Sequence, residues 1–366
     1  ELQNSIDVNI LLKSTNEYDS FIQTKKITPS ILSAFFTFII NHSNICKTDG
    51  TIKKKYETLL LEIFPQQENI LFFQYILISL ENLNLAKNND GCISLDMEKV
   101  KNFCALSEIE QYCYLCAAST ICTRTELFRR AKLVYDVLSF MQDKAYEKSI
   151  LFRIIFLQNE KTKNNLTSNS SYFASLLAQH NKVNTNPTDE SSDFIYNLIN
   201  NAVEFNLLQK THSSVDDRDV YIPINFSQLD SMQDKKTVSI DGGFNITIMP
   251  GSTLQQLFSI CQCLELRHAD TVSSYEITRQ SCMKSFDNNL TPQKIIENFN
   301  KVLIHKIPDV LINSLEEWFK NYSSTNIYKG FILQVDKEKQ ILVEKNPYIE
   351  KHIKQIFASG IYLMDF

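Results

Sequence analysis

Glycine is scarce in this chain, with only 7 in 366 residues, whereas about 7% of residues are glycine in an average protein. Glycine supplies the backbone conformations that phosphate-binding loops and tight turns use. Its scarcity argues against glycine-rich phosphate loops and against a turn-dense all-β fold, and it favours helices. The hydrophobic fraction of 43% is ordinary for a globular chain, and the length suits two or three domains.

Helix and hairpin signals alternate along the first part of the chain. Apolar residues recur at helical spacing in Thr28–Ile40, Lys53–Phe64 and Asn69–Leu83, and a hairpin pattern follows around Asp90-Gly91. The same order recurs in the next part. Helices are predicted at Ser107–Ile121, Glu126–Met141, Tyr146–Gln158 and Asp193–Asn206, with a polar loop at Glu160–Ser171 and a second hairpin over Leu207–Ile224. Because a winged helix ends with a helix that leads into a hairpin, we predict two winged-helix-like units, residues 1–106 and 107–226.

The pattern changes after the polar link Ser227–Lys236. Residues 237–366 are predicted to form a small α+β domain, so the whole chain is mainly α with α+β. The hydroxyls of Thr278 and Thr291 are placed to cap two of its helices, over Arg279–Phe286 and Pro292–Val302. Its other predicted elements are listed in chain order: strands Thr237–Ile240 and Phe244–Met249, helix Thr253–Cys261, strands Cys263–Ala269 and Ser273–Ile277, helix Pro308–Asn321, a hairpin of Ile327–Val335 with Gln340–Glu344, and a closing helix Tyr348–Ala358.

Short motifs in this domain occur in a specific order. They are the strand Phe244–Met249 ending at Pro250-Gly251, the strand–cap–helix segment Tyr275–Ser281, the pair Ile295-Ile296 in a helix, Ile307-Pro308 opening the next helix, and the closing hairpin Gly330–Val343. This order resembles the small domain that precedes the motor in XPB-type DNA repair helicases, which also forms the C-terminal part of bacterial helicase-associated proteins. The resemblance covers about Val238–Ile353, and the front of the chain resembles the tandem winged helices of those bacterial proteins.

One position departs from that family, which usually has a glycine after the first helix that follows the Tyr275–Ser281 segment. Here the sequence reads Asp287-Asn288-Asn289. Asparagine tolerates left-handed backbone better than most residues, so we expect the turn to be kept.

The resemblance implies a partner and not an active site. A helicase motor needs G-x-x-x-x-G-K-[S/T], and the sequence lacks that segment; Gly242-Gly243 falls in a hairpin turn with no lysine behind it. The histidines do not fall in metal-ligand spacing, there is no G-x-S-x-G, and adjacent carboxylates such as Glu316-Glu317 suit a solvated surface. We therefore expect no enzyme activity, no cofactor and no small-molecule substrate.

The nine cysteines point to a reducing compartment. An odd number in a chain of this length is typical of reduced thiols in the cytoplasm. Cys113-x-x-Cys116 suggests either a zinc site or two buried cysteines on one helix; no second ligand pair follows, which favours burial. Neither a secretory signal nor an apolar stretch long enough to span a membrane is visible.

Nucleic-acid binding would depend on local basic residues, because the net charge is −5. The candidate contacts are Lys53, Lys54 and Lys55, then Arg124, Arg129, Arg130 and Lys132, and in the second hairpin Lys210 and Arg218. Such short runs also occur on solvated helix faces. The two helices before the hairpins, Asn69–Leu83 and Asp193–Asn206, contain no lysine or arginine, which disfavours sequence-specific reading of DNA.

Two functions remain open from the sequence. The first is a cytoplasmic, non-enzymatic accessory protein in DNA repair or transcription-linked processing, which docks on an XPB-type helicase or a nucleic-acid complex. The second is direct, sequence-nonspecific DNA binding through the basic residues named above.

Overall fold

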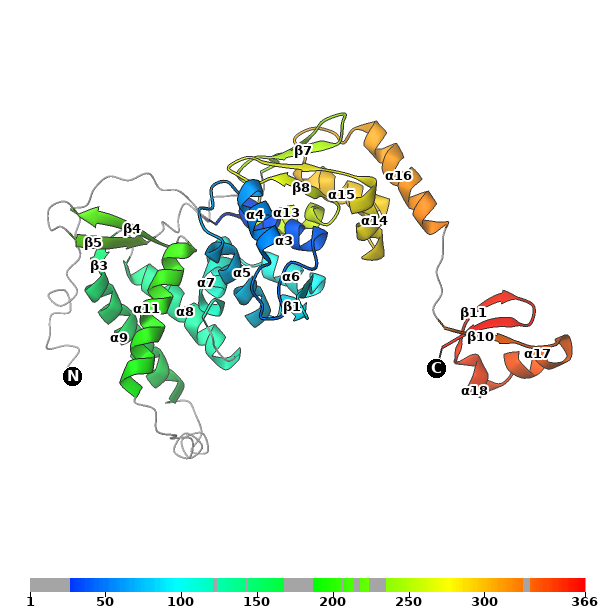
Figure 1. The fold of residues 1–366 in the computed structure, drawn as a ribbon, viewed down its shortest axis with the longest axis horizontal. Coiled ribbons are helices and arrows are strands. Elements are labelled where there is room, and N and C mark those ends of the chain that lie inside the picture. Colours follow the sequence, from blue (N-terminus) through cyan, green and yellow to red (C-terminus); the bar gives the residue numbers. More distant parts are fainter. Residues whose placement is uncertain are drawn as a thin grey trace. The chain divides into compact units, whose positions relative to one another are not determined.

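A computed structural model describes residues 27–120, 124–141, 144–167, 187–205, 207–213, 218–223, 235–324 and 330–365. The fold mixes helices with several small antiparallel sheets, which agrees with the predicted α+β character (Figure 1). The chain divides into two compact units, Glu1–Leu315 (unit 1) and Glu316–Phe366 (unit 2). That boundary falls inside one helix, α16 (Asp309–Ser323). None of the described helices is long and apolar enough to cross a membrane.

The described part of unit 1 starts with three helices and a hairpin, in the predicted order. They are α3 (Pro29–Asn41), α4 (Lys54–Ile63), α5 (Leu71–Asn82), β1 (Ala86–Asn89) and β2 (Cys92–Leu95), followed by α6 (Met97–Cys104). Asp90 and Gly91 both have positive φ, as a two-residue hairpin turn requires. The hydroxyl of Thr28 accepts from the amide of Ile31 and so caps α3, whose residues are buried from Pro29 to Ile39.

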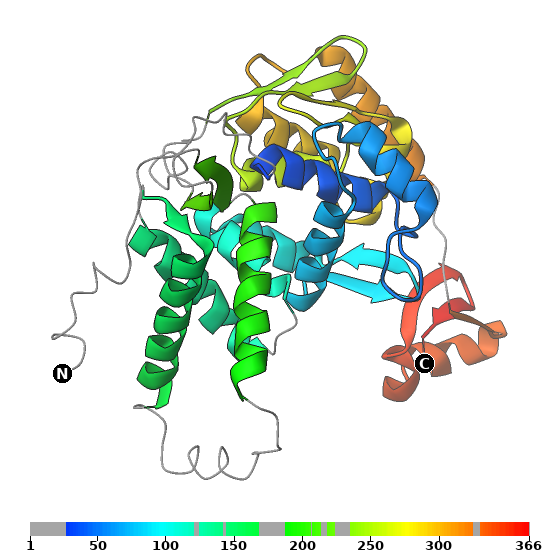
Figure 2. The same ribbon diagram turned by 60° about the vertical axis from the view of Figure 1, so that its left-hand side comes forward.

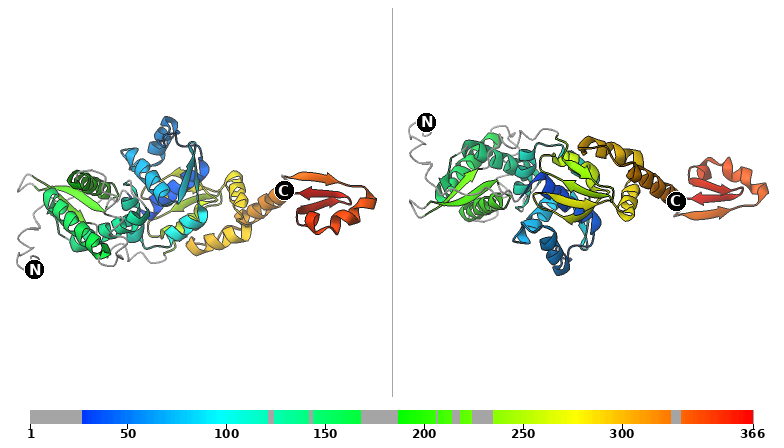
Figure 3. Two further views of the ribbon diagram at one scale, coloured as in Figure 1. Left: turned by 90° about the horizontal axis from the view of Figure 1, so that it is seen from below. Right: turned by 90° about the horizontal axis from the view of Figure 1, so that it is seen from above.

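The described residues of the second part of unit 1 form four helices and a three-stranded sheet. Its elements are α7 (Glu108–Ala118), α8 (Arg124–Met141), β3 (Tyr146–Glu147), α9 (Lys148–Thr167), α11 (Pro187–Glu204), β4 (Leu208–Ser213) and β5 (Arg218–Pro223), with strand order β3-β5-β4. Figure 3 shows α9 and α11 side by side next to this sheet. The predicted loop at Glu160–Ser171 is wrong up to Thr167, because α9 continues to that residue; the rest of it lies outside the described residues. The identification of winged helices in both parts stays a prediction.

The third part contains a four-stranded antiparallel sheet with one buried face. Its elements are β6 (Val238–Ile240), β7 (Asn245–Ile248), α13 (Leu254–Cys261), β8 (Glu265–His268), β9 (Ser273–Glu276), α14 (Arg279–Asp287), α15 (Pro292–Val302) and α16, with strand order β6-β7-β9-β8. Ile246 pairs with Tyr275 and both are buried, whereas Asn245 and Glu276 on the opposite face are more accessible. This alternation is typical of a sheet that packs on helices with one face only. The predicted caps Thr278 and Thr291 are confirmed.

Helix α3 packs against this third part, which lies far along the sequence (Figure 2). Helix α3 contacts α13 and β8, and Phe36 meets Phe258 edge to face with ring centroids 5.8 Å apart. The hydroxyls of Ser30 and Ser273 lie 3.0 Å apart across the same contact. A helix that is apolar on all sides needs neighbours on all sides, and these residues supply them.

Besides the end of α16, the described residues of unit 2 form a three-stranded sheet and two short helices. Its elements are β10 (Phe331–Gln334), α17 (Lys337–Glu344), α18 (Pro347–Glu350), β11 (Ile353–Ala358) and β12 (Ile361–Met364), with strand order β10-β12-β11. Val343, Tyr362 and Met364 form its core. Two predictions are wrong here: Gln340–Glu344 lies in a helix and not a strand, and the predicted helix Tyr348–Ala358 ends at Glu350 and gives way to β11.

Candidate functional site

The three lysines at the start of α4 are accessible. Lys53 is the N-cap residue, and its ammonium group donates to the backbone carbonyl of Asn44 at 3.2 Å. Lys54 and Lys55 follow in the first turn and are exposed, and the Lys55 ammonium lies 5.5 Å from the ring centroid of Tyr56. Among the described residues, this is the predicted basic run that has no ion pair with a carboxylate, and Lys54 and Lys55 are its two exposed members.

Sequence reasoning missed a fourth lysine near this run. Lys284 on α14 donates to the backbone carbonyl of Asn41 at 3.3 Å, although 243 residues separate them. Burial lowers the pKa of His42, and the nearby charges of Lys284 and Lys55 lower it further. Lys55 and Lys284 are therefore both close enough to His42, at the end of α3, to affect its pKa, and the charge of Glu265 acts in the opposite direction. No local pattern in the sequence indicates this arrangement.

Arg129 and Arg130 serve the packing of α8. Their side chains are only 16% and 12% exposed. Arg129 donates to the side-chain oxygen of Asn159 at 2.7 Å, and Arg130 donates to the hydroxyl of Thr120 at 2.8 Å. The Arg130 guanidinium also lies 4.4 Å from the ring centroid of Phe194. These two arginines are held by protein groups, which leaves them poorly placed to contact phosphates.

Four basic residues predicted to contact nucleic acid remain. Three of them are paired with carboxylates, and the side chain of the fourth is not among those that the structure describes. Arg124 begins α8, and its side chain is outside the part that the structure describes. The pairs are Lys132–Asp136 at 3.8 Å, Lys210–Asp219 at 2.6 Å and Arg218–Glu147 at 2.9 Å. Exposed pairs of this kind are weak, so a phosphate can replace the carboxylate. The basic residues predicted to contact nucleic acid thus lie on three separate elements: α4, α8 and the β4–β5 hairpin.

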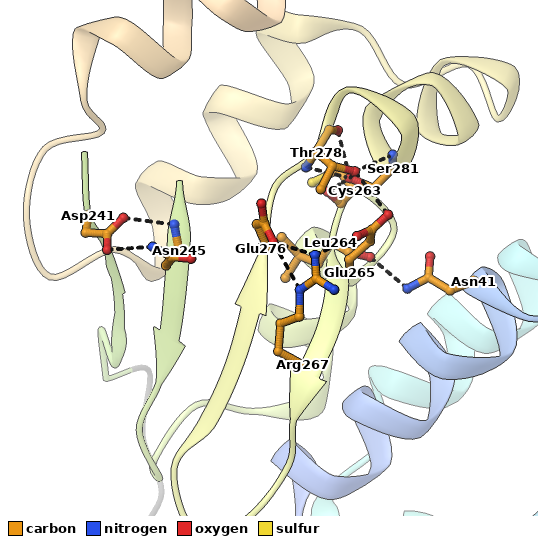
Figure 4. A network of polar contacts seen from close by, with 10 residues as sticks. All are labelled: Asn41, Asp241, Asn245, Cys263, Leu264, Glu265, Arg267, Glu276, Thr278 and Ser281. Atoms are coloured by element: carbon orange, nitrogen blue, oxygen red, sulfur yellow. Dashed lines mark hydrogen bonds and ion pairs between the residues drawn. The ribbon is translucent and has the colours of Figure 1, made fainter. Parts of the chain in front are cut away.

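The motif Tyr275–Ser281 forms a polar network at one end of the four-stranded sheet (Figure 4). Arg267 on β8 donates to Glu276 at 3.0 Å through Nε, and its Nη2 contacts Glu265 at 3.2 Å. The hydroxyl of Thr278 donates to Glu265 at 3.2 Å, and that of Ser281 donates to the carbonyl of Cys263 at 2.8 Å. This network joins strand β9, the loop after it and helix α14.

This network can fix the positions of strands β8 and β9 and of helix α14. Its two carboxylates, Glu265 and Glu276, are both bound by Arg267. Thr278 and Ser281 form a reciprocal capping box at the start of α14. Asn289 has a φ of 62°, so an asparagine does adopt the left-handed turn in the Asp287–Asn289 segment, where the resembled family usually has a glycine. Among the described residues, no group of three or more histidine, cysteine, aspartate or glutamate side chains could hold a metal ion.

The described cysteines are mostly buried thiols. Cys113 and Cys116 lie buried on α7, as predicted for an apolar helix face. Burial raises the pKa of the Cys113 thiol to about 12, so it stays protonated and unreactive. Cys92 is exposed, whereas Cys122 lies outside the described residues.

Unit 2 exposes many large apolar side chains for so small a fold. They are called here the unit 2 apolar residues, with exposed fractions from 42% to 78%: Phe331, Ile332, Ile341, Leu342, Tyr348, Ile356 and Phe357. They lie on both edge strands and both helices of the unit. Single exposed apolar side chains are normal, but this many in one small unit is typical of a protein-interaction module.

Comparison with known proteins gives a relative but no function. No protein-family model matches the chain. An uncharacterized protein of Treponema pallidum (strain Nichols) is 20% identical over 360 residues, which cover 92% of this chain and 50% of that protein. The chain thus spans about half the length of that relative.

Proposed function

We propose that this chain is a non-enzymatic accessory protein in DNA repair or transcription-linked processing, which docks on an XPB-type helicase or its nucleic-acid complex. The observation that carries the proposal is the set of unit 2 apolar residues, exposed on a small sheet. They fall partly within Gly330–Val343, the segment that ends the resemblance to the helicase accessory domain. Docking is favoured over DNA binding because Arg129 and Arg130 are held within the protein, and the other described basic candidates lie on separate elements.

Binding of the purified chain to a purified XPB-type helicase tests the proposal. Ile332→Lys on β10 and Leu342→Lys on α17 place a charge on exposed apolar positions. Each is expected to weaken binding by about tenfold or more, as loss of a buried apolar anchor does. Gln334→Lys is the matched control, because it adds the same charge at another exposed position of β10. Absence of binding by the wild-type chain, or equal loss in all three variants, would refute docking through unit 2.

The alternative of sequence-nonspecific DNA binding is favoured by one observation, the placement of Lys55 and Lys284 close to His42. These two lysines and the exposed Lys54 present positive charge from two elements. Each lysine that neutralises a phosphate releases counterions, so such binding weakens steeply with salt.

Fluorescence anisotropy with duplex and forked DNA over a salt series separates the two functions. Under the alternative, Lys54→Gln and Lys55→Gln weaken binding and flatten its salt dependence. Lys337→Gln, at an exposed lysine of unit 2, is the control for net charge. Arg129→Gln is expected to leave DNA retention unchanged. If the wild-type chain does not bind DNA at low salt, direct binding is excluded and docking is the remaining function.

A further inference from the structure

The sheet of unit 2 has two edges among the described residues. Strand β12 is central, and β10 and β11 each pair with it along one side. An edge strand presents a row of backbone N–H and C=O groups along its outer side, and a further strand can pair with them. The two edges of this sheet differ in how open they are to such pairing.

Strand β11 carries two features that proteins use to block pairing at a sheet edge. Its register with β12 shifts twice, between Ile353 and Gln355 and between Ile356 and Ala358. Such bulges bend a strand and break the regular spacing of its backbone groups. Lys354 also places a charged side chain on this strand. The β11 edge is therefore poorly suited to accept a further strand.

Strand β10, which is described over its whole length, is regular and uncharged. Its residues Phe331–Gln334 pair with β12 in unbroken register, and none of them is charged or a proline. Leu333 packs against the core of unit 2, whereas Ile332 is 68% exposed and Gln334 is also exposed. The β10 edge is therefore the one on which a further strand fits.

One hydrogen bond fixes which backbone groups of β10 face outward. The amide of Val335 donates to the carbonyl of Gly360 at 2.8 Å, one step beyond the end of the β10–β12 pairing. Along an antiparallel pair, residues that bond to the partner strand alternate with residues that do not. Leu333 therefore bonds to β12 as Val335 does, and the N–H and C=O groups of Ile332 and Gln334 point away from β12.

We propose that the β10 edge binds an extended segment of the helicase partner, which adds a fourth strand to this sheet. The inference rests on the proposed function, because it specifies how the docked partner is held. The outward backbone groups of Ile332 and Gln334 bond to those of the segment, and the exposed side chain of Ile332 packs on an apolar neighbour in it. The segment is therefore extended and carries apolar residues at alternate positions.

The occupant is a different polypeptide and not a second copy of this chain. Each copy has a net charge of −5, so two copies repel one another. An uncharged or basic segment of a partner meets no such repulsion. Pairing of β10 with itself is a distinct outcome of the tests below.

Two substitutions at one position test strand addition in the binding of the full chain to the helicase. Gln334→Pro removes an outward N–H that β12 does not use, and the proline ring lies where the added strand would pair. It is expected to weaken binding by about tenfold or more, because a carbonyl of the segment is left unpaired. Gln334→Ala keeps the N–H and is the matched control, which should change affinity less than about twofold. Thermal melting of both variants shows that they are folded.

Hydrogen exchange of the wild-type complex, measured by mass spectrometry at single-residue resolution, needs no variant. In the free chain, the amides of Leu333 and Val335 are expected to be protected by β12, whereas those of Ile332 and Gln334 exchange faster. Binding of the helicase is expected to slow exchange at Ile332 and Gln334 by about tenfold or more. Unchanged exchange at these two amides in the complex would overturn strand addition.

The outcomes distinguish this inference from the proposed function. If Ile332→Lys weakens binding of the helicase and Gln334→Pro does not, docking through unit 2 stands and strand addition is overturned. If the wild-type chain does not bind the helicase, the proposed function fails, and a phage library of short random peptides becomes the probe. Peptides that bind the wild-type chain and Gln334→Ala but not Gln334→Pro would then support strand addition, and their absence would overturn it. A dimer of the chain that Gln334→Pro abolishes in analytical ultracentrifugation would also overturn it, because β10 would then pair with a second copy.

Discussion

Thr278 joins two elements through a single hydroxyl. It accepts from the amide of Ser281 at 3.1 Å, which caps α14, and it donates to Glu265 on β8 at 3.2 Å. Thr278→Ala removes both bonds and is expected to lower the free energy of unfolding by about 1 kcal/mol. Thr278→Ser keeps the hydroxyl and is expected to cost only a few tenths of that. Urea unfolding of the two variants measures the difference, and equal losses would show that the hydroxyl is unimportant.

His42 makes stability depend on pH. Burial, with the charges of Lys284 and Lys55, lowers its pKa below the usual 6.5 and favours neutral imidazole in the folded protein. The unfolded chain then binds more protons near that pH. The stability contributed by neutral His42 is present above pH 6.5 and is lost as the pH falls through the lowered value.

His42→Phe keeps an aromatic ring beside Phe38, whose centroid lies 4.7 Å from that of His42, and cannot be protonated. Its melting temperature is therefore expected to fall less than that of the wild-type chain between about pH 7.5 and about pH 5.5. The same substitution at the exposed His305 is the control. Parallel melting curves for wild type and His42→Phe would contradict the prediction.

At the scale of elements, the turn of the β1–β2 hairpin requires glycine at Gly91 for two reasons. Gly91 has a φ of +89°, and a Cβ built there would overlap the backbone carbonyl oxygen of Cys46. Gly50 has a similar φ of +84° with nothing within 4 Å of such a Cβ.

Gly50→Ala is therefore expected to lower the free energy of unfolding by about 1–2 kcal/mol, the cost of left-handed backbone at a residue with a Cβ. Gly91→Ala is expected to cost distinctly more, because Cys46 must also move. Chemical denaturation of both variants checks the order, and a Gly91→Ala variant as stable as Gly50→Ala would show that the hairpin shifts freely.

The elements that the sequence predicts correctly depend on neighbouring residues. The caps Thr278 and Thr291 and the Asp90-Gly91 turn each follow from a few adjacent side chains. The end of the chain was harder to predict for a physical reason. Gln340–Glu344 and Ile353–Ala358 are short apolar runs, which fit a helix or a strand equally well until their packing partners are known.

The basic candidate site could be predicted only where its residues are adjacent in the sequence. The lysine run of α4 is visible in the sequence, but its neighbour Lys284 comes from a distant helix. The roles of Arg129 and Arg130 depend on Asn159 and Thr120, which only the fold brings close.

At the scale of the molecule, α3 links the beginning of unit 1 to its end. Phe36 is fully buried against α13, so Phe36→Ala is expected to lower the free energy of unfolding by about 3–5 kcal/mol. Native-state hydrogen exchange should show faster exchange in both α3 and α13. Phe128→Ala, at a side chain that is 65% exposed, is the control and should cost less than about 0.5 kcal/mol. Faster exchange in α3 alone would mean that the two regions are stable independently.

The packing of α3 also has a consequence for synthesis. Thr37 and Cys261, which meet across this contact, are 224 residues apart. At roughly 5–20 residues per second, the ribosome needs about 10–45 s to make the intervening chain. During that interval α3 cannot yet pack on α13, so its apolar surface stays uncovered on the growing chain. Chaperones bind apolar segments of this kind. We therefore expect chains that terminate before α13 to aggregate, and we expect translation speed across this interval to affect the yield of folded protein.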